Sequence, residues 1–215
     1  INTVSYKVGN TEYIRQCIAS NPDDVVAMHI KASRPKAITM ELELKLLRQA
    51  NVVASGNQLI YTGNAEFEKH GKGGVHFEGR IAVQIKGGTI KAEGKKLYIE
   101  KATEVTLLSD VRTNFKNNTF SGYNYKIKCE KTIELASKKD FKTLKKKHIE
   151  DYSPLFSRVG LSFEHHAKFD HLPNDERWAR VKKGESDPGL DALFFQYARY
   201  LLIASSRPNS PLPVA

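Results

Sequence analysis

Two neighbouring carboxylates, Asp175 and Glu176, are of the residue type that catalyses the hydrolysis of glycosidic bonds. Glycosidases use two carboxyl groups that flank the bond, one as an acid and one as a base or nucleophile. Adjacent residues in the first turn of a helix point in different directions, however, and their charge there interacts favourably with the helix dipole. We therefore interpret Asp175-Glu176-Arg177 as a helix start. Asp151 and Tyr152 are interpreted as structural, so no catalytic residue is assigned.

A second group, His165, His166, Asp170 and His171, has the side-chain types that bind transition metals. Zinc sites usually hold their ligands on rigid elements at a defined short spacing. These four residues lie instead in a segment predicted as a loop between a strand and a helix. We interpret them as surface residues, and we expect no metal and no other cofactor.

Two further features have the composition of a binding site. The segment Gly71-Lys72-Gly73-Gly74 is glycine-rich, but no predicted strand–helix junction surrounds it as in a phosphate-binding loop, so it is interpreted as a hairpin loop. Five tyrosines could stack on sugar rings, although tyrosines scattered over strands and loops are usually packing residues. These tyrosines are Tyr13, Tyr61, Tyr98, Tyr123 and Tyr125.

The formal net charge of +10 raises the question of nucleic-acid binding. Much of the excess lies on one predicted amphipathic helix, with few arginines for base edges and no interleaved aromatic residues for base stacking. We interpret these lysines as a solvated helix face and expect no specific nucleic-acid partner. They are Lys126, Lys128, Lys131, Lys138, Lys139, Lys142, Lys145, Lys146 and Lys147.

The remaining composition sets limits on the class of protein. No run approaches the roughly 18 apolar residues of a membrane helix, so no membrane partner is expected. Two cysteines exclude a small disulfide scaffold, and Cys17 is predicted to be buried in a strand. Asn117-Asn118-Thr119 is a glycosylation sequon. Because Ile1 already lies in strand-like sequence, we expect the natural start of the chain, with any secretory signal, to lie upstream.

Residues 1–112 are predicted to form an antiparallel β-sandwich, which makes the fold mainly β with a helical C-terminal part. Apolar and polar residues alternate clearly over 38–46, as in a strand with one buried face. Gly79 interrupts a second alternating run and predicts a bulge. Gly87-Gly88 and Glu93-Gly94 predict hairpin turns.

Residues 113–172 are predicted to link the sandwich to a second, helical domain. A polar loop over 113–125 is followed by apolar residues at helical spacing from Ile133 to Phe156. Pro154 is expected to end one helix and begin another, because proline disrupts a helix interior. Residues 159–163 are predicted to form a short strand that returns to the sheet.

Residues 173–215 are predicted to form two helices that are too few to close a core of their own. Asn174 is the expected N-cap of the first helix. The second is expected to begin with Asp187 as its cap and Pro188 as its first residue. Its apolar residues spread around the cylinder, which predicts burial on several sides. We therefore expect self-association through the helix at 188–206.

Four segments of the chain resemble glycoside hydrolase family 95. Tyr13-Ile14-Arg15 followed by Ser20–Val26 is similar to the family pattern Y-x-R-E-x-F-x-S-x-P-D-x-V, although Gln16 replaces its Glu. Three later segments are similar to L-x-x-x-H-x-x-D-Y-x-x-L-F-x-R-V, to L-P-T-D-E-R and to a block that ends in Ser-Arg-Pro, where Ala198 replaces a Gly. They are residues 144–159, 172–177 and 195–208.

The resemblance implies a β-sandwich of the type found in families 65 and 95, linker helices and the first helix of an incomplete (α/α)6 barrel. It implies a secreted or periplasmic enzyme that hydrolyses terminal α-1,2-linked L-fucosides of glycans with inversion. In the family, a Glu acts as the acid, and Asn residues with an Asp activate water. These residues follow the Ser-Arg-Pro block and are expected beyond Ala215, so the chain alone is expected to be inactive and to meet the fucosylated glycan only through the missing catalytic domain.

Three alternatives stay open from the sequence. The sandwich could itself bind carbohydrate as a non-catalytic module. The whole enzyme could act on α-L-galactosides, which differ from fucosides by one hydroxyl group. A basic nucleic-acid-binding protein is retained only because of the net charge.

Overall fold

The structure, a computed structural model, forms two compact units, residues 1–149 and residues 150–215. No helix in the described part of the chain is long and apolar enough to cross a membrane. The described residues are 1–47, 49–65, 74–115, 124–163 and 166–207, without the side chain of His166.

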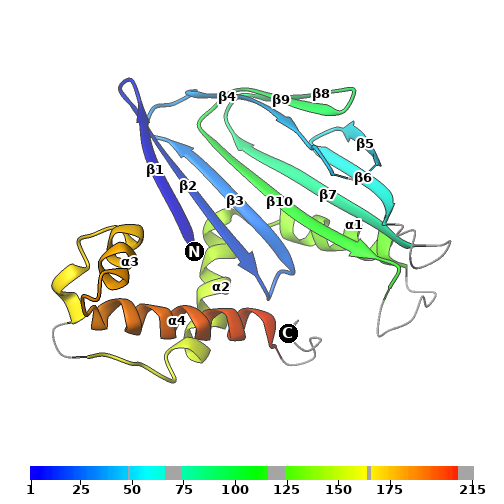
Figure 1. The fold of residues 1–215 in the computed structure, drawn as a ribbon. Coiled ribbons are helices and arrows are strands. Elements are labelled where there is room, and N and C mark those ends of the chain that lie inside the picture. Colours follow the sequence, from blue (N-terminus) through cyan, green and yellow to red (C-terminus); the bar gives the residue numbers. More distant parts are fainter. Residues whose placement is uncertain (48, 66–73, 116–123, 164–165, 208–215) are drawn as a thin grey trace. The chain divides into compact units, whose positions relative to one another are not determined.

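The first unit contains two antiparallel sheets (Figure 1). The larger sheet has the strand order β1-β2-β3-β10-β7-β6-β5, and the smaller has the order β4-β9-β8. The predicted mainly antiparallel β fold with a helical C-terminal part is confirmed. The strands are β1 (Asn2–Val8), β2 (Thr11–Ser20), β3 (Val25–Ala32), β4 (Ile38–Glu43), β5 (Ala50–Ser55), β6 (Gln58–Ala65), β7 (Val75–Lys86), β8 (Thr89–Glu93), β9 (Lys96–Ala102) and β10 (Glu104–Thr113).

One apolar core contains residues from both sheets. Leu97 and Ile99 alternate with outward-facing residues along β9, and Leu59 and Val83 come from the larger sheet. All four side chains are almost completely buried. Burial of each such side chain contributes about 1.5–3 kcal/mol, so this cluster is the main stabilising feature between the two sheets.

A second core lies between the larger sheet and two helices, α1 (Tyr125–Ser137) and the first part of α2 (Phe141–Phe156). Ile133 and Leu144 of these helices belong to one buried cluster with Leu108 of the sheet. α1 therefore lies with the sheets in the first compact unit. The domain boundaries predicted after residues 112 and 172 stay predictions.

Two of the predicted glycine features are wrong. The ladder continues through Gly79, which pairs with Tyr61 on one side and Val111 on the other, so no bulge occurs there. A Cβ atom at Gly79 would lie 2.0 Å from Cζ of Tyr61, so the glycine makes room for that ring. Gly87-Gly88 carries the chain from β7 in one sheet to β8 in the other. The hairpin predicted at Gly94 is confirmed between β8 and β9.

The helical region differs from the prediction at three points. Asp140 accepts a hydrogen bond from the Thr143 amide at 2.8 Å, so α2 begins as a helix separate from α1. Pro154 lies within the final turn of α2, where few backbone bonds remain to be lost. The predicted strand at 159–163 is wrong, because this segment has no regular structure and Arg199 donates to the Val159 carbonyl instead.

The second unit contains α3 (Asn174–Lys182), α4 (Pro188–Ser205) and the short 3-10 helix η2 (His166–Phe169). Asn174 is the first helical residue rather than the cap, and Pro173 precedes it without a side-chain hydrogen bond. The predicted start of α4 is confirmed, because Asp187 accepts a hydrogen bond from the Leu190 amide at 2.9 Å.

Candidate functional site

The two candidate carboxylates lie in an exposed helix turn next to a buried arginine. Asp175 and Glu176 are exposed in the first turn of α3. Arg177 beside them is only 4% exposed. Its guanidinium donates to Asp187 at 2.7 and 2.8 Å and to Asp170 at 3.0 Å. The clamp of Arg177, Asp187 and Asp170 therefore ties the start of α4 to α3.

Both members of the buried pair are charged at neutral pH. Hydrogen bonds from Arg177 hold the pKa of Asp187 below its ordinary value of 3.8, and the bond to Asp187 raises the pKa of Arg177. A carboxylate that stays ionised and accepts three hydrogen bonds is a poor proton donor. Asp187 therefore serves the fold rather than acid catalysis.

The predicted metal cluster is not assembled by its described members. Asp170 is engaged by Arg177, and His171 is exposed. Within the described ranges, no three His, Cys, Asp or Glu side chains gather as metal ligands would. Several other candidates lie outside the described residues: His165, the side chain of His166, Gly71–Gly73, Asn117–Thr119 and Tyr123.

The described tyrosines do not form a common platform. Tyr13 on β2 stacks on Tyr6 of β1 with ring centroids 5.3 Å apart. Tyr61 on β6 is buried, Tyr98 lies on β9, and Tyr125 begins α1. Their separate positions and local packing agree with the interpretation as packing residues.

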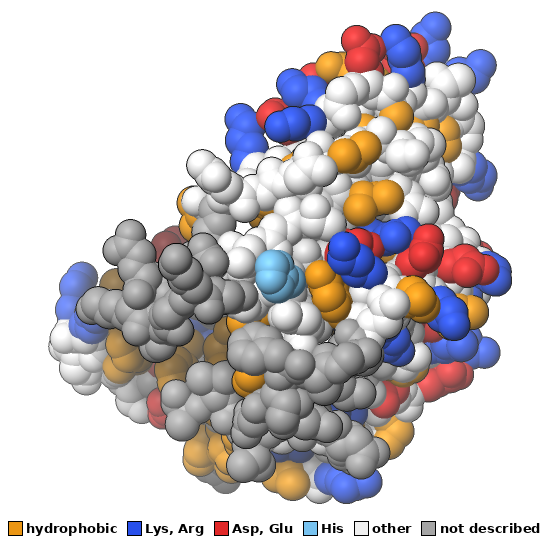
Figure 2. Space-filling model, turned by 90° about the vertical axis from the view of Figure 1, so that its right-hand side faces the viewer, with side chains coloured by type: hydrophobic (Ala, Val, Ile, Leu, Met, Phe, Trp, Pro, Cys, Tyr) orange, Lys and Arg blue, Asp and Glu red, His pale blue; other side chains and the backbone are white. Residues whose placement is uncertain are grey.

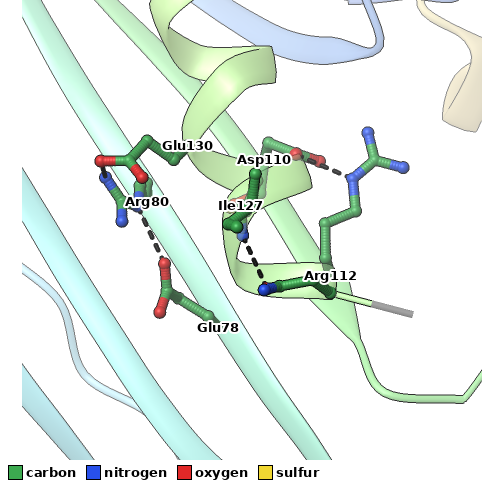
Figure 3. A network of polar contacts seen from close by, with 8 residues as sticks. Glu78, Arg80, Asp110, Arg112, Ile127 and Glu130 are labelled. Atoms are coloured by element: carbon green, nitrogen blue, oxygen red, sulfur yellow. Dashed lines mark hydrogen bonds and ion pairs between the residues drawn. The ribbon is translucent and has the colours of Figure 1, made fainter. Parts of the chain in front are cut away.

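A polar network holds α1 on the sheet (Figure 3). Arg80 of β7 donates to Glu78 at 2.9 Å and to Glu130 of α1 at 3.1 Å, while Arg112 donates to Asp110 at 2.8 Å. Alternating polar residues on β7 and β10 resemble a solvent face in the sequence. Because α1 covers these residues, they form an interface between the helix and the sheet.

The two cysteines differ in burial, and the predicted burial of Cys17 is wrong. Cys17 is only half-buried, whereas Cys129 on α1 is fully buried and its thiol lies 3.6 Å from the Asp110 carbonyl oxygen. Burial raises the pKa of the Cys129 thiol to about 12. The thiol therefore stays protonated and unreactive at neutral pH.

The basic segment lies on two helices and their junction rather than on one helix. Part of it lines a hollow of about 820 Å³ between the α1–α2 junction and the large sheet. His29 lies there with Nδ1 hydrogen-bonded to the Thr106 hydroxyl at 2.9 Å, and its ring stacks on Phe141 at 4.7 Å. Burial lowers the pKa of His29, although Glu104 opposes the shift. The sequence alone does not reveal this hollow, because its walls come from segments that are far apart in the chain.

A second, apolar hollow of about 500 Å³ lies in the second unit between α3 and α4. Trp178 and Phe194 line it from the two helices. Phe194 is 66% exposed and Leu202 60% exposed, so α4 presents large apolar side chains that the described residues of this unit leave uncovered.

Charges of both signs alternate on the surface. Figure 2 shows Lys and Arg side chains next to Asp and Glu side chains at the upper end and along the right side of the view. Lys96, for example, contacts both Glu41 and Glu43 across strands β9 and β4. Such interspersed charges are typical of a solvated surface.

Comparison with known proteins identifies the class to which this fold and these helices belong. Residues 1–118 match the family described as glycosyl hydrolase family 65, N-terminal domain, so the chain belongs to that family of sandwich domains. Residues 140–215 match the family described as glycosyl hydrolase family 95 catalytic domain. The resemblance to family 95 is therefore confirmed, with a match to an N-terminal domain followed by a match to a catalytic domain.

Two curated relatives align with nearly all of the chain. The protein described as alpha-L-fucosidase 2 from Arabidopsis thaliana is 30% identical over 96% of this chain and 28% of its own length. The protein described as alpha-fucosidase A from Aspergillus niger is 28% identical over 97% of this chain and 27% of its own. The chain thus spans about a quarter of these relatives.

A solved structure described as a kojibiose phosphorylase from the human microbiome aligns with 72% of the residues of this chain, and the alignment covers 23% of the solved chain. The TM-score is 0.48 and the sequence identity 12%.

Proposed function

We propose that this chain is the non-catalytic N-terminal part of a glycoside hydrolase that acts on terminal α-L-fucosides. The observation that carries the proposal is the order of the two family matches on one chain, a family 65 N-terminal domain followed by a family 95 catalytic domain. Both curated relatives with this alignment have fucosidase names, and the chain spans 28% and 27% of them.

We further propose inversion at α-1,2-linked fucose, with catalytic groups in the part of the relatives that this chain does not match. Inverting hydrolases place their two carboxyl groups roughly 6.5–9.5 Å apart across the substrate, with space for water. In the second unit, Asp187 and Asp170 are engaged by Arg177, and Asp175 is exposed at a helix start. These positions support a structural role for Asp170, Asp175 and Asp187.

The test is an assay of the full-length natural protein that contains these 215 residues. We expect release of L-fucose from 2′-fucosyllactose, with the β-anomer as the first product in proton NMR spectra. Preferential cleavage of an aryl α-L-galactoside would favour the galactosidase alternative. Release of neither sugar by the folded protein would contradict the proposal. A location outside the cytoplasm, secreted or periplasmic, stays a prediction.

We also propose that the isolated chain self-associates through α4. Phe194 and Leu202 expose large apolar surfaces on this helix, and contiguous apolar surface favours association. Light scattering should show a lower mass for Leu202→Asp, and no change for Leu161→Asp, an exposed apolar control outside the helix. A wild-type chain that stays monomeric at high concentration would contradict this proposal.

A further inference from the structure

The hollow beneath the α1–α2 junction has cationic side chains on opposite walls. Lys31 and Lys86 reach it from strands β3 and β7, and Lys142 and Lys145 reach it from α2. All four belong to the first compact unit. The two walls therefore present like charges to one another across an open space.

Negative charge in the hollow is too scarce to balance these lysines. Glu104 is shared by Lys31 at 3.5 Å and Lys86 at 3.6 Å, with His29 a further 3.9 Å contact. Lys142 and Lys145 make no ion pair within the described residues. Lys145 donates instead to the Gln16 side-chain oxygen at 3.2 Å.

One other carboxylate lines the hollow, and it has a local role. Asp140 accepts the hydrogen bond from the Thr143 amide that begins α2. Asp140 keeps its negative charge while it accepts this bond, and it interacts electrostatically with Lys142. Lys138 and Lys139 at the junction are paired with Glu134 and Asp23. The four lysines therefore face two carboxylates, Glu104 and Asp140, and a bound anion would balance the positive charge that remains.

Size and neutral donors define the ligand further. A hollow of about 820 Å³ is in the range of sites for molecules of several rings and exceeds what one inorganic anion fills. Three neutral polar residues also line the hollow, and each already makes hydrogen bonds within the protein: Gln16 with Lys145, Gln84 with the Ser137 and Lys139 carbonyls, and Thr106 with His29. A polyhydroxylated ligand would share or exchange these bonds. We propose that this hollow binds an anionic saccharide through its carboxylate or sulfate groups. The choice of a saccharide rests on the proposed function, whereas the negative charge follows from the lysines.

The same observations disfavour nucleic acid as the ligand. Single-stranded nucleic acids need exposed aromatic faces on which bases stack. The aromatic rings of this hollow, His29 and Phe141, stack on each other with centroids 4.7 Å apart. Its described cations are lysines, which act as point charges rather than as bidentate readers of base edges.

The test is a calorimetric titration of the 215-residue chain with trigalacturonate, beside neutral galactotriose, sodium sulfate and a DNA duplex. The double variant Lys142→Gln, Lys145→Gln should bind trigalacturonate roughly tenfold more weakly, since an exposed ion pair contributes up to about fivefold to an equilibrium constant. The control variant Lys131→Gln, Lys147→Gln loses the same charge from exposed positions, one on α1 and one on α2, that do not line the hollow. It should change the affinity less than twofold.

Several results would overturn the inference. They are equal losses in the two double variants, equal affinity for galactotriose, and full competition by sulfate or DNA at matched charge concentration. No detectable binding of trigalacturonate at low salt would also contradict it. These titrations use no fucoside and measure no hydrolysis. A failed fucosidase assay would therefore not affect the conclusion on anion binding. A failed binding titration would likewise not affect the conclusion on fucoside hydrolysis.

Discussion

Removal of one partner from the clamp between Arg177 and Asp187 should unfold the second unit far more easily. Both side chains are almost inaccessible, 4% and 3% exposed, and two hydrogen bonds of 2.7 and 2.8 Å join them. Breaking a buried pair by removing one member costs about 3–5 kcal/mol, because the other charge is left desolvated. A unit of this size has a total stability of about 3–10 kcal/mol, so the loss is a large share.

The assay is urea unfolding followed by the fluorescence of Trp178, the only tryptophan in the chain and a residue of α3. We expect Arg177→Met to lower the free energy of unfolding by about 3 kcal/mol. The double variant with Asp187→Asn should cost less than the sum of the two single changes, because the charges then disappear together. Glu185→Gln, which removes an exposed partner of Arg180, is the control and should cost under about 0.5 kcal/mol.

Acid should weaken the same unit. The folded pKa of Asp187 lies below its ordinary value, so its stabilising contribution is complete above pH 3.8 and is lost as the pH falls through the folded pKa. Asp187→Asn should remove this acid sensitivity. An Arg177→Met variant as stable as the wild type, or strictly additive single and double variants, would refute the reasoning about the clamp.

Three other perturbations test the first unit. Gly79→Ala should cost about 1–3 kcal/mol of unfolding free energy in urea, because its Cβ would overlap the tyrosine ring above it; Gly160→Ala, with open space around it, should be neutral within about 0.5 kcal/mol. The pKa of His29 is lower in the folded state, so the unfolded state binds a proton first as the pH falls below 6.5. The free energy of unfolding should therefore decrease with falling pH in this range. His29→Gln should make the free energy of unfolding less dependent on pH. Ellman's reagent at pH 8 should modify Cys17 and leave Cys129 intact until urea is added, and rapid modification of both thiols in the native chain would contradict the burial argument.

Features that depend on a few neighbouring residues could be predicted from the sequence. Asp187 before Pro188 defines a helix start by local chemistry, and the structure contains it. The alternation in 38–43 predicts a strand with one buried face, and β4 has that pattern. Leu46, by contrast, is exposed beyond the end of the strand, because alternation alone does not show where pairing stops.

Features that depend on distant segments could not be predicted. Ala82 and Val83 are adjacent on β7 and both buried, because one faces α1 and the other faces the smaller sheet. Nothing in the local pattern shows that a helix some forty residues later covers one of these faces. The lysine-lined hollow is a similar case, since His29 and Phe141 stack only after the sheet and α2 come together.

We propose that this chain is part of a fucoside hydrolase whose catalytic groups lie in the portion of the relatives that the chain does not match. The most direct measurement is the release of L-fucose from 2′-fucosyllactose by the purified 215-residue chain, compared with a buffer blank. We predict no release above the blank, because the candidate carboxylates Asp175 and Glu176 lie exposed at a helix start and Asp187 is held in the clamp with Arg177. Fucose release that survives purification and disappears in Asp175→Asn or Glu176→Gln would contradict the claim.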